Sequence, residues 1–361
     1  MRTRAAAIAL ALGLGLAASL SGAPYTVTDA LGRAVAFDVV PSRIVIAGRG
    51  TLILVDAVYL FPGAGDRVVG VAVTDQGLGD VLPVLDPSHA RKVRFPNDAG
   101  AEQIAGARPD LVILKTYSKQ RVGDALERVG IPVLYLDLET PESFSADVRT
   151  LGELFRQPER AASVVRWYES RVAAVTAAVA SGAAAGAAGT ARPRVLVVQA
   201  TAKDAELAVT VPPASWIQAR MVETAGGTAV WAAQNLTTGW QKVGVEQVAS
   251  WNPEHVFVVS YASSAAEAAR RLAESAVWQA TRAGRASAIR AFPADLASWD
   301  QSDARWILGL EWLAATLHPD RFPGFDLRAE ATAFYREMYA LDPETIRSQI
   351  LPRLAPAATG R

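Results

Sequence analysis

The pattern of apolar and polar positions along the chain predicts strands that alternate with helices. Strands are expected where short apolar runs are bounded by turn residues, and helices where apolar residues recur every three or four positions. Such alternation is typical of parallel, doubly wound sheets. The expected strands lie within 25–33, 43–47, 68–73, 111–114, 132–138, 194–199 and 256–260; the expected helices are 52–60, 122–129, 215–225, 265–274, 304–317 and 329–339, with a loop-rich stretch at 74–97.

One stretch of this pattern occurs twice, at 102–114 and at 246–258. Both copies read Glu-Gln-aliphatic-Ala, three residues, Pro, an acidic residue and then an apolar run. A residue before proline is pushed out of the helical region, so a short helix should end there and a strand buried on both faces should follow. The copies lie roughly 140 residues apart, whereas solenoid repeats recur every 20–50 residues. We therefore expect two similar lobes, each a doubly wound, three-layer α/β domain.

The middle of the chain predicts a long helix between the two lobes. Thr140-Pro141-Glu142 has an N-cap threonine, a proline at the first helical position and an acidic first turn. A second helix should begin at Pro158 and run to about Val179, a length of roughly 33 Å. The expected division is an N-terminal lobe at 24–141, an interdomain helix at 142–180, a flexible Ala/Gly-rich loop at 181–191, a C-terminal lobe at 192–328, and a C-terminal helix and tail at 329–361.

The first residues predict export. Residues 1–4 are basic, residues 5–20 are apolar, and small residues precede Pro24, which is the pattern of a signal peptide spanning 1–23. No later stretch reaches the roughly 18 apolar residues of a membrane-spanning helix. We expect a periplasmic protein whose mature chain starts near Pro24.

Composition narrows the function classes. The chain has 361 residues with 36 basic and 36 acidic side chains, so it lacks the net positive charge of proteins that bind nucleic acid by bulk charge. It has no cysteine, which excludes disulfides, thiol catalysis and cysteine-held iron–sulfur clusters, and leads us to expect that it is not a lipoprotein. There is no Gly-x-Ser-x-Gly elbow and no P-loop, so an enzyme is disfavoured and no cofactor is expected.

An ordered set of motifs occurs between about Tyr25 and Phe325, at 41–45, 63–71, 108–113, 130–133, 151–152, 223–227 and 240–253. Together they resemble those of the periplasmic binding proteins of ABC importers for iron–siderophore complexes, haem and cobalamin, the class with one rigid interdomain helix. The resemblance implies two lobes with a ligand cleft between them, and a monomer that delivers a small molecule to an ABC permease of the inner membrane. It also implies that Glu102 and Glu246 dock into arginine pockets of that permease. The alternative is that both are first-turn helix acids favoured by the helix dipole.

Candidate ligand contacts follow the predicted strands, because ligands bind at the carboxyl ends of the strands in such sheets. Arg49, between two glycines and before a helix, suits an anion, although it can also be a surface arginine in a tight loop. Trp240 matches a cleft aromatic of the cobalamin-type proteins, with ordinary packing as its alternative. The full set of expected ligand contacts is Arg49, Thr51, Asp75, Lys115, Tyr117, Trp240, Tyr261, Trp299 and Arg305.

The remaining candidates in this set carry alternatives of their own. Tyr117 and Tyr261 can ligate iron or haem as phenolates, but they also fit a cleft edge or a core. Trp299 and Arg305 belong to a pattern similar to one subset of the family for iron complexes or oxyanions.

The ligand is expected to arrive as a preformed complex or anion. His89, His255 and His318 are poor metal ligands, and no His or acidic pair shows metal-ligand spacing on one helix, so no metal site is expected. A ferric siderophore is favoured among the ligands of the family. Two other ligand classes stay open: an oxyanion such as molybdate or tungstate, held by Arg49 and Lys115, and haem or a corrinoid, held by aromatic residues. A non-catalytic exported scaffold stays open as an alternative function.

Overall fold

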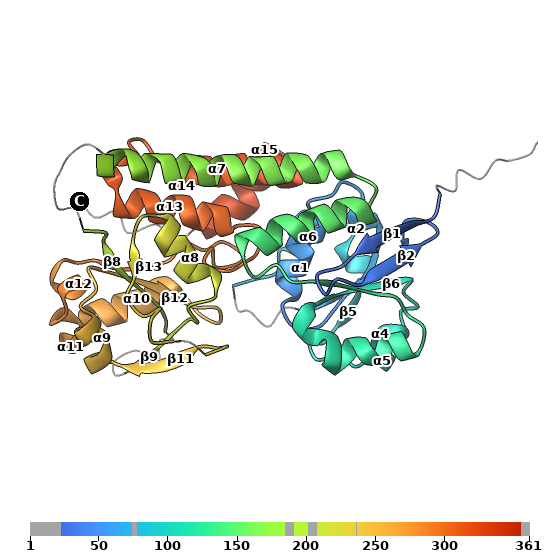
Figure 1. Cartoon of the computed structure of the whole chain (residues 1–361), viewed down its shortest axis with the longest axis horizontal. Coiled ribbons are helices and arrows are strands. Elements are labelled where there is room, and N and C mark those ends of the chain that lie inside the picture. The colour runs from blue at the N-terminus through green and yellow to red at the C-terminus, as the bar shows by residue number, and fades with distance from the viewer. Residues whose placement is uncertain (1–22, 74–77, 185–190, 201–207, 236, 355–361) are drawn as a thin grey trace, which may run out of the picture.

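The structure, a computed structural model, describes residues 23–73, 78–184, 191–200, 208–235 and 237–354. The predicted signal peptide lies outside these residues except for Ala23. The molecule has two lobes side by side, with one long helix, α7 (Pro158–Ala184), running along both (Figure 1). This arrangement confirms the expected two-lobed α/β fold.

The N-terminal lobe is built on a parallel sheet whose strand order reverses in its middle. The order is β5 (Val93–Phe95), β4 (Val68–Ala72), β3 (Ile44–Ile46), β6 (Leu111–Lys115) and β7 (Val133–Leu136). All neighbouring strands are parallel. The chain moves outward in opposite directions from the neighbouring strands β3 and β6, so a crevice for ligands opens between their carboxyl ends.

Helices cover both faces of this sheet, which gives the expected three layers. One face packs against α4 (Ala101–Ala105) and α5 (Asp124–Arg128), and the other against α1 (Thr51–Val58) and α6 (Pro141–Leu154). Apolar residues of β6 are buried on both sides, as its uninterrupted apolar sequence predicts. The short helices α2 (Ala64–Arg67) and α3 (Leu82–Leu85) and the hairpin of β1 (Tyr25–Thr28) and β2 (Ala34–Phe37) complete the lobe.

Strand β5 corrects the expectation that 74–97 is loop. It has three residues, Val93-Arg94-Phe95, and only Phe95 is buried. A run this short, with arginine at its centre, carries no apolar signal of its own. Its place at the edge of the sheet, paired with β4, makes it a strand.

The C-terminal lobe has a mixed sheet rather than the fully parallel one that the sequence predicts. Strands β8 (Arg194–Gln199), β12 (His255–Val259), β13 (Ile289–Ala291) and β10 (Thr228–Ala229) run parallel. Strands β9 (Ala208–Val211) and β11 (Gln241–Gly244) add an antiparallel edge. Strand β11, Gln-Lys-Val-Gly, is short and largely polar and carries no strand signal, whereas β9, Ala-Val-Thr-Val, has the β-branched residues of a strand and was overlooked. The helices are α8 (Ile217–Thr224), α9 (Val245–Trp251), α10 (Ala265–Glu274), α11 (Ala276–Gln279) and α12 (Arg282–Arg285).

The two copies of the repeated stretch fold in the same way. Helix α4 ends before Pro109 and leads into β6, and α9 ends before Pro253 and leads into β12. The prediction of a short helix followed by a buried strand is confirmed for both. The boundaries proposed for the lobes stay a prediction.

Helices along one edge of the molecule, at the top of Figure 1, join the lobes. The Thr140 side chain caps α6 by accepting a hydrogen bond from the Ser143 amide, and α7 follows with 27 residues, or about 40 Å. It includes 181–184, which we expected in a loop; 185–190 lie outside the described residues. Below α7 in Figure 1 lie α13 (Trp306–Leu317) and α14 (Leu327–Tyr339). The short helix α15 (Pro343–Thr345) follows α14 in the sequence. Within the described ranges, no helix has the length and apolar character needed to span a bilayer.

Candidate ligand-binding cleft

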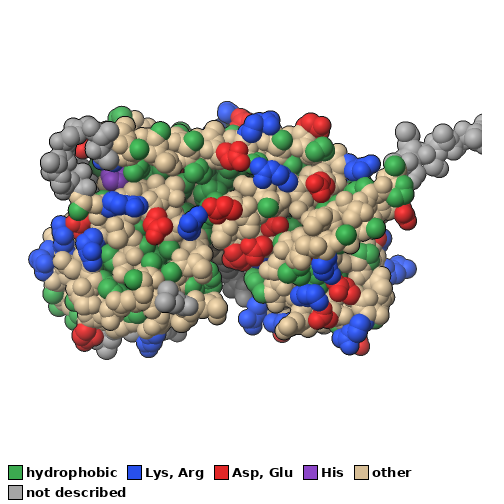
Figure 2. All heavy atoms as spheres, in the orientation of Figure 1, with side chains coloured by type: hydrophobic (Ala, Val, Ile, Leu, Met, Phe, Trp, Pro, Cys, Tyr) green, Lys and Arg blue, Asp and Glu red, His purple; other side chains and the backbone are tan. Residues whose placement is uncertain are grey.

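A cavity of about 390 Å³ lies between the two lobes, where a furrow separates them on the molecular surface (Figure 2). Its lining comes from segments that follow β3, β4, β5, β6 and β7 in one lobe, and from segments of the other lobe that precede α8, β11 and α13 or follow β12. The cavity therefore lies at the carboxyl ends of the N-terminal sheet, as predicted. The residues that line it are Gly48, Arg49, Gly50, Thr51, Leu52, Ile53, Val73, Asn97, Tyr117, Glu139, Trp216, Ile217, Gln218, Trp240, Tyr261, Gln301 and Ser302.

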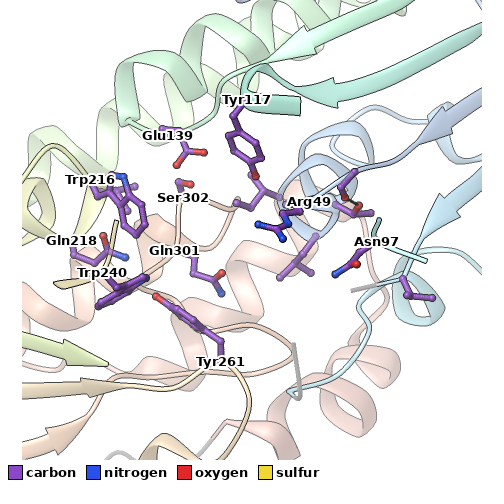
Figure 3. Close-up of a pocket in the computed structure, with 17 residues that line it drawn as sticks. Arg49, Asn97, Tyr117, Glu139, Trp216, Gln218, Trp240, Tyr261, Gln301 and Ser302 are labelled. Carbon is purple, nitrogen blue, oxygen red and sulfur yellow. Dashed lines mark hydrogen bonds between the residues drawn. The ribbon is translucent and has the colours of Figure 1, made fainter. Parts of the chain in front are cut away.

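The glycine-flanked loop before α1 presents Arg49 to this cavity. Gly48 and Gly50 have φ angles of 80° and 74°, a left-handed conformation that favours glycine. A Cβ atom at Gly50 would also meet the hydroxyl at the tip of the exposed Tyr117 side chain, which would have to move aside, so the left-handed φ angle is the stronger reason for glycine here. The exposed Arg49 side chain points into the cavity (Figure 3).

The start of α1 adds to the positive potential of this loop. Gly50, the N-cap residue, provides no side-chain hydrogen bond to the first turn. The Thr51 hydroxyl donates to the Gly48 carbonyl at 2.6 Å, which holds the loop against the helix. Unpaired backbone N–H groups at a helix N-terminus attract anions. Arg49 and this helix start together can hold a negatively charged ligand.

Lys115 lies behind the cavity surface, not in it. Its side chain is fully buried, and its ammonium group pairs with Glu139 at 2.7 Å and donates to the Asp137 carbonyl. Glu139 and Tyr117 lie between this ammonium and the cavity, with the Tyr117 ring centroid 5.8 Å away. Lys115 therefore does not line the cavity, contrary to the position that we expected for it, and it holds Glu139, which does line the cavity, by this ion pair. Whether it contacts a ligand stays a prediction.

The C-terminal lobe contributes a wall of three aromatic rings. Trp216 and Trp240 meet edge to face with centroids 5.9 Å apart, and Trp240 meets Tyr261 in the same way at 6.0 Å (Figure 3). All three line the cavity. Sequence reasoning missed Trp216, because it follows β9, the strand that the sequence did not reveal.

A buried carboxylate fixes two side chains of this wall. Asp300 accepts hydrogen bonds from the Tyr261 hydroxyl at 2.7 Å and from the Gln218 amide at 3.0 Å. Ser298 donates to its other oxygen at 2.5 Å. Burial raises the pKa of Asp300, although these hydrogen bonds oppose the rise. The arrangement holds Tyr261 of this wall and the neighbouring Gln218 in place.

Trp299 and Arg305 do not reach the cavity, which corrects the expectation that both line it. Both are fully buried, because the segment before α13 folds inward beneath the cavity. Arg305 is enclosed by aspartates, with its guanidinium 2.5 Å from Asp56 and 3.2 Å from Asp303. The residues of this segment that do reach the cavity are Gln301 and Ser302, the immediate neighbours of the expected ones.

The structure thus brings together five of the nine expected ligand contacts: Arg49, Thr51, Tyr117, Trp240 and Tyr261. Asp75 lies outside the described residues. The lining adds polar residues without a sequence signal: Asn97, Glu139, Gln218, Gln301 and Ser302. Whether the lining residues contact a ligand stays a prediction.

Charge in the cavity lining is carried by Arg49 and Glu139; the remaining polar groups are hydroxyls and amides. Across the described residues, no three His, Asp or Glu side chains gather in a way that can hold a metal ion. Burial lowers the pKa values of His255 and His318, both outside the lining. Because Glu139 is paired with Lys115, the charge of Arg49 is the one that the lining does not offset, and a ligand with negative charge and apolar surface would complement it.

Glu102 and Glu246 occupy matching places on the two lobes. Each is exposed and lies in the first turn of its helix, α4 or α9. Both helices lie on the side of the molecule away from α7 (Figure 1). The two carboxylates therefore flank the cleft on one face, one on each lobe.

Comparisons with known proteins agree with this architecture. Residues 44–296 match the family described as periplasmic binding protein. No curated protein matches the chain. Among solved structures, a periplasmic solute-binding protein from Veillonella parvula is 22% identical, with a TM-score of 0.70 over 91% of this chain and 97% of its own.

Two further solved structures have bound ligands. The molybdate-binding protein MolA of Haemophilus influenzae, solved with molybdate, is 20% identical, with a TM-score of 0.70 over 88% of this chain and 98% of its own. Helicobacter pylori CeuE, solved with a Ni-His complex, is 16% identical, with a TM-score of 0.68 over 91% of this chain and 99% of its own. At such identities the likeness establishes a shared fold, not a shared ligand.

Proposed function

We propose a function that follows from one fact: the chain belongs to the periplasmic binding protein family. It is the solute-binding component of an ABC importer, which captures a small molecule in the periplasm and delivers it to a permease in the inner membrane. The observation that carries this proposal is the cavity between the lobes, whose two walls come from different sheets. A site divided in this way can release its ligand when the lobes move apart. The proposal includes no catalytic step.

The ligand that the cavity fits best is an anionic metal chelate, in particular a ferric siderophore. Arg49 and the start of α1 favour negative charge, and the wall of Trp216, Trp240 and Tyr261 favours an organic surface. A volume of about 390 Å³ is within the range of small-molecule sites. A chelate also brings its metal already coordinated, which suits a lining without a set of metal ligands.

A second candidate is an oxyanion such as molybdate or tungstate. It is favoured by the position of Arg49 at a helix start, opposite the amide and hydroxyl groups of Gln301 and Ser302. The molybdate in MolA shows that a protein of similar fold takes such a ligand. Haem or a corrinoid is the third candidate, with Tyr117, 55% exposed at the cavity edge, as its iron-facing residue.

Delivery is proposed to use Glu102 and Glu246 as anchors on the permease. Their exposure and their matching positions support this role. Charge-assisted hydrogen bonds from arginine to a carboxylate are about twice as strong as neutral ones, so two such contacts can hold the complex in one orientation. Export through the signal peptide and a monomeric state belong to the same proposal.

Thermal unfolding in the presence of candidate ligands tests the binding role. The probes are a ferric tris-catecholate, a ferric tris-hydroxamate, molybdate, haemin and cyanocobalamin. A ligand at a hundred times its dissociation constant stabilises the folded state by about 2.7 kcal/mol. We expect one probe class to raise the melting temperature of the wild type and Arg49→Ala to reduce the rise, with Arg128→Ala, on exposed α5, as the matched control. No shift with any probe at millimolar concentration would overturn the proposal.

A further inference from the structure

A buried cluster of charged residues joins the two lobes directly beneath the cleft. We call Asp56, Asp295, Asp303 and Arg305 the interlobe cluster; their exposed fractions are 0%, 5%, 0% and 0%. Asp56 lies on α1 of the N-terminal lobe, and the others lie between β13 and α13 of the C-terminal lobe. The cluster is therefore a buried charged contact between the lobes, in contrast to the exposed pair of Arg220 and Glu142, which also joins them at 2.8 Å.

The contact between Asp56 and Arg305 is a two-point one. The two guanidinium nitrogens of Arg305 lie 3.2 and 2.5 Å from the two Asp56 oxygens, a fork that fixes distance and orientation. Asp303 accepts a hydrogen bond from the same guanidinium at 3.2 Å. Only arginine offers this planar fork, so the geometry depends on the residue type as well as on its charge.

Helix α14 completes the enclosure with two tyrosines. The Tyr335 hydroxyl donates to Asp295 at 2.6 Å and lies 3.4 Å from Arg305. The Tyr339 hydroxyl donates to the Asp56 carbonyl at 3.2 Å. The charged groups are thus held from three directions, by α1, by the segment before α13 and by α14.

Each half of the cluster is rigidly connected to one wall of the cavity. Asp56 is five residues along α1 from Thr51, about 7.5 Å, and Arg49 directly precedes this helix. On the other side, Gln301 and Ser302 directly precede Asp303. A change in the distance between Asp56 and Arg305 must therefore change the distance between the cavity walls.

We propose that the Asp56–Arg305 pair is an interlobe clasp that sets the width of the cleft. Asp56 and Arg305 are positioning residues, which act on the ligand through Arg49 on one wall and through Gln301 and Ser302 on the other. Buried ion pairs add little net stability compared with apolar packing, so a role in geometry accounts better for a fully buried pair. Its effect on affinity rests on the proposed binding function, whereas its effect on cleft width does not.

The test measures cleft width without any ligand. The chain has no cysteine, so two can be introduced for spin labels at exposed sites on the two lobes, Val129→Cys and Ala249→Cys. Pulsed electron paramagnetic resonance then gives the distribution of distances between the labels. We expect one narrow distribution for the labelled parent protein. Arg305→Lys, which keeps the charge but loses the fork, should at least double the width of the distribution or shift its maximum.

Two further variants keep the test decisive. Tyr335→Phe removes one hydroxyl from the cluster and no charge, so it should broaden the distance distribution less than Arg305→Lys does. It is the test variant if Arg305→Lys does not fold. Asp86→Asn is the matched control, because Asp86 pairs with Lys92 at 2.8 Å, buried within one lobe. It should lower the melting temperature and leave the distribution unchanged. Unchanged distributions in folded Arg305→Lys, or in Tyr335→Phe where Arg305→Lys does not fold, would overturn the clasp.

A ligand readout separates this proposal from the proposed function. The probe is a ferric tris-catecholate, and its binding is measured by tryptophan fluorescence. Arg305→Lys should weaken this binding about tenfold relative to the parent protein. A parent protein that does not bind this probe counts against the siderophore assignment, and the distance measurement still decides the clasp. Broadened distances with unchanged affinity for a probe that the parent binds would overturn the link between clasp and site.

Discussion

The interlobe cluster makes a specific prediction about how stability depends on pH, and Asp56→Asn tests it. Burial raises the pKa of Asp56 from 3.8 to about 8, against the opposing attraction of Arg305. The interlobe cluster holds three aspartates and one arginine, so the folded protein keeps a proton on the cluster that the unfolded chain releases above the ordinary pKa, while Arg305 stays paired with an ionised aspartate. Because the folded state binds more protons between these two values, its stability falls as the pH rises through this window.

The size of this effect follows from the shift. Each pH unit within the window changes the free energy of unfolding by up to about 1.4 kcal/mol for one such group. Between pH 5 and pH 7, Asp56 alone lowers stability by up to about 3 kcal/mol. Burial also raises the pKa of Asp303, in the same cluster, to about 6, so part of the pH dependence comes from Asp303. We therefore expect Asp56→Asn to remove about 1–3 kcal/mol of this pH dependence.

Urea unfolding at pH 5, 6 and 7, followed by far-ultraviolet circular dichroism, measures the slope directly. The wild type should lose stability across this range faster than Asp56→Asn. Asp86→Asn is the control: although burial opposes it, hydrogen bonds from Lys92 and Tyr59 lower the pKa of Asp86 to about 2, so its contribution is constant above pH 5. Equal slopes for the wild type and Asp56→Asn would refute a proton held at this buried carboxyl.

Four other predictions concern the cleft and the docking face. Arg49→Ala should weaken binding of an anionic probe by about 1.5–3 kcal/mol, or roughly 10- to 150-fold, measured by isothermal titration calorimetry; equal affinity would contradict an anion site there. Gly50→Ala should cost about 1–3 kcal/mol in urea unfolding, since its Cβ meets the Tyr117 hydroxyl at a φ of 74°; an unchanged midpoint would contradict the strain. Glu102→Ala and Glu246→Ala should each weaken binding to the cognate permease in nanodiscs and leave ligand affinity unchanged; permease binding unaffected by both would exclude the docking role. Small-angle scattering should show nearly equal radii of gyration with and without ligand; a large decrease would exclude a rigid α7.

Most of the fold was predictable from the sequence because its signals are local. The repeated unit was predicted from the apolar runs of β6 and β12 and from the prolines before them, and the start of α6 from the cap at Thr140. What the sequence did not reveal is the edge strand β11, because four largely polar residues carry no periodic signal and the strand is defined by its pairing with β9. The β-branched residues of β9 could have indicated a strand, but the run is short and was overlooked.

The candidate site was predictable only as far as strand ends were known. Arg49 and Tyr261 follow strands that the sequence revealed, and both line the cavity. Trp216 follows a strand that it did not reveal. Trp299 and Arg305 were assigned to the cleft from a resemblance, but both are buried in the structure. The segment before α13 turns the Arg305 side chain toward Asp56. Burial of this kind depends on the opposite lobe and cannot be read from neighbouring residues in the chain.

The central claim is that this protein carries a metal chelate between its lobes. Native mass spectrometry with a visible absorption spectrum, on protein purified from its own periplasm, tests this most directly. The account predicts a coloured adduct of several hundred daltons, lost in Arg49→Ala. A colourless protein with an adduct of under about 200 daltons, the size of a lone oxyanion or other small solute, would contradict the chelate assignment.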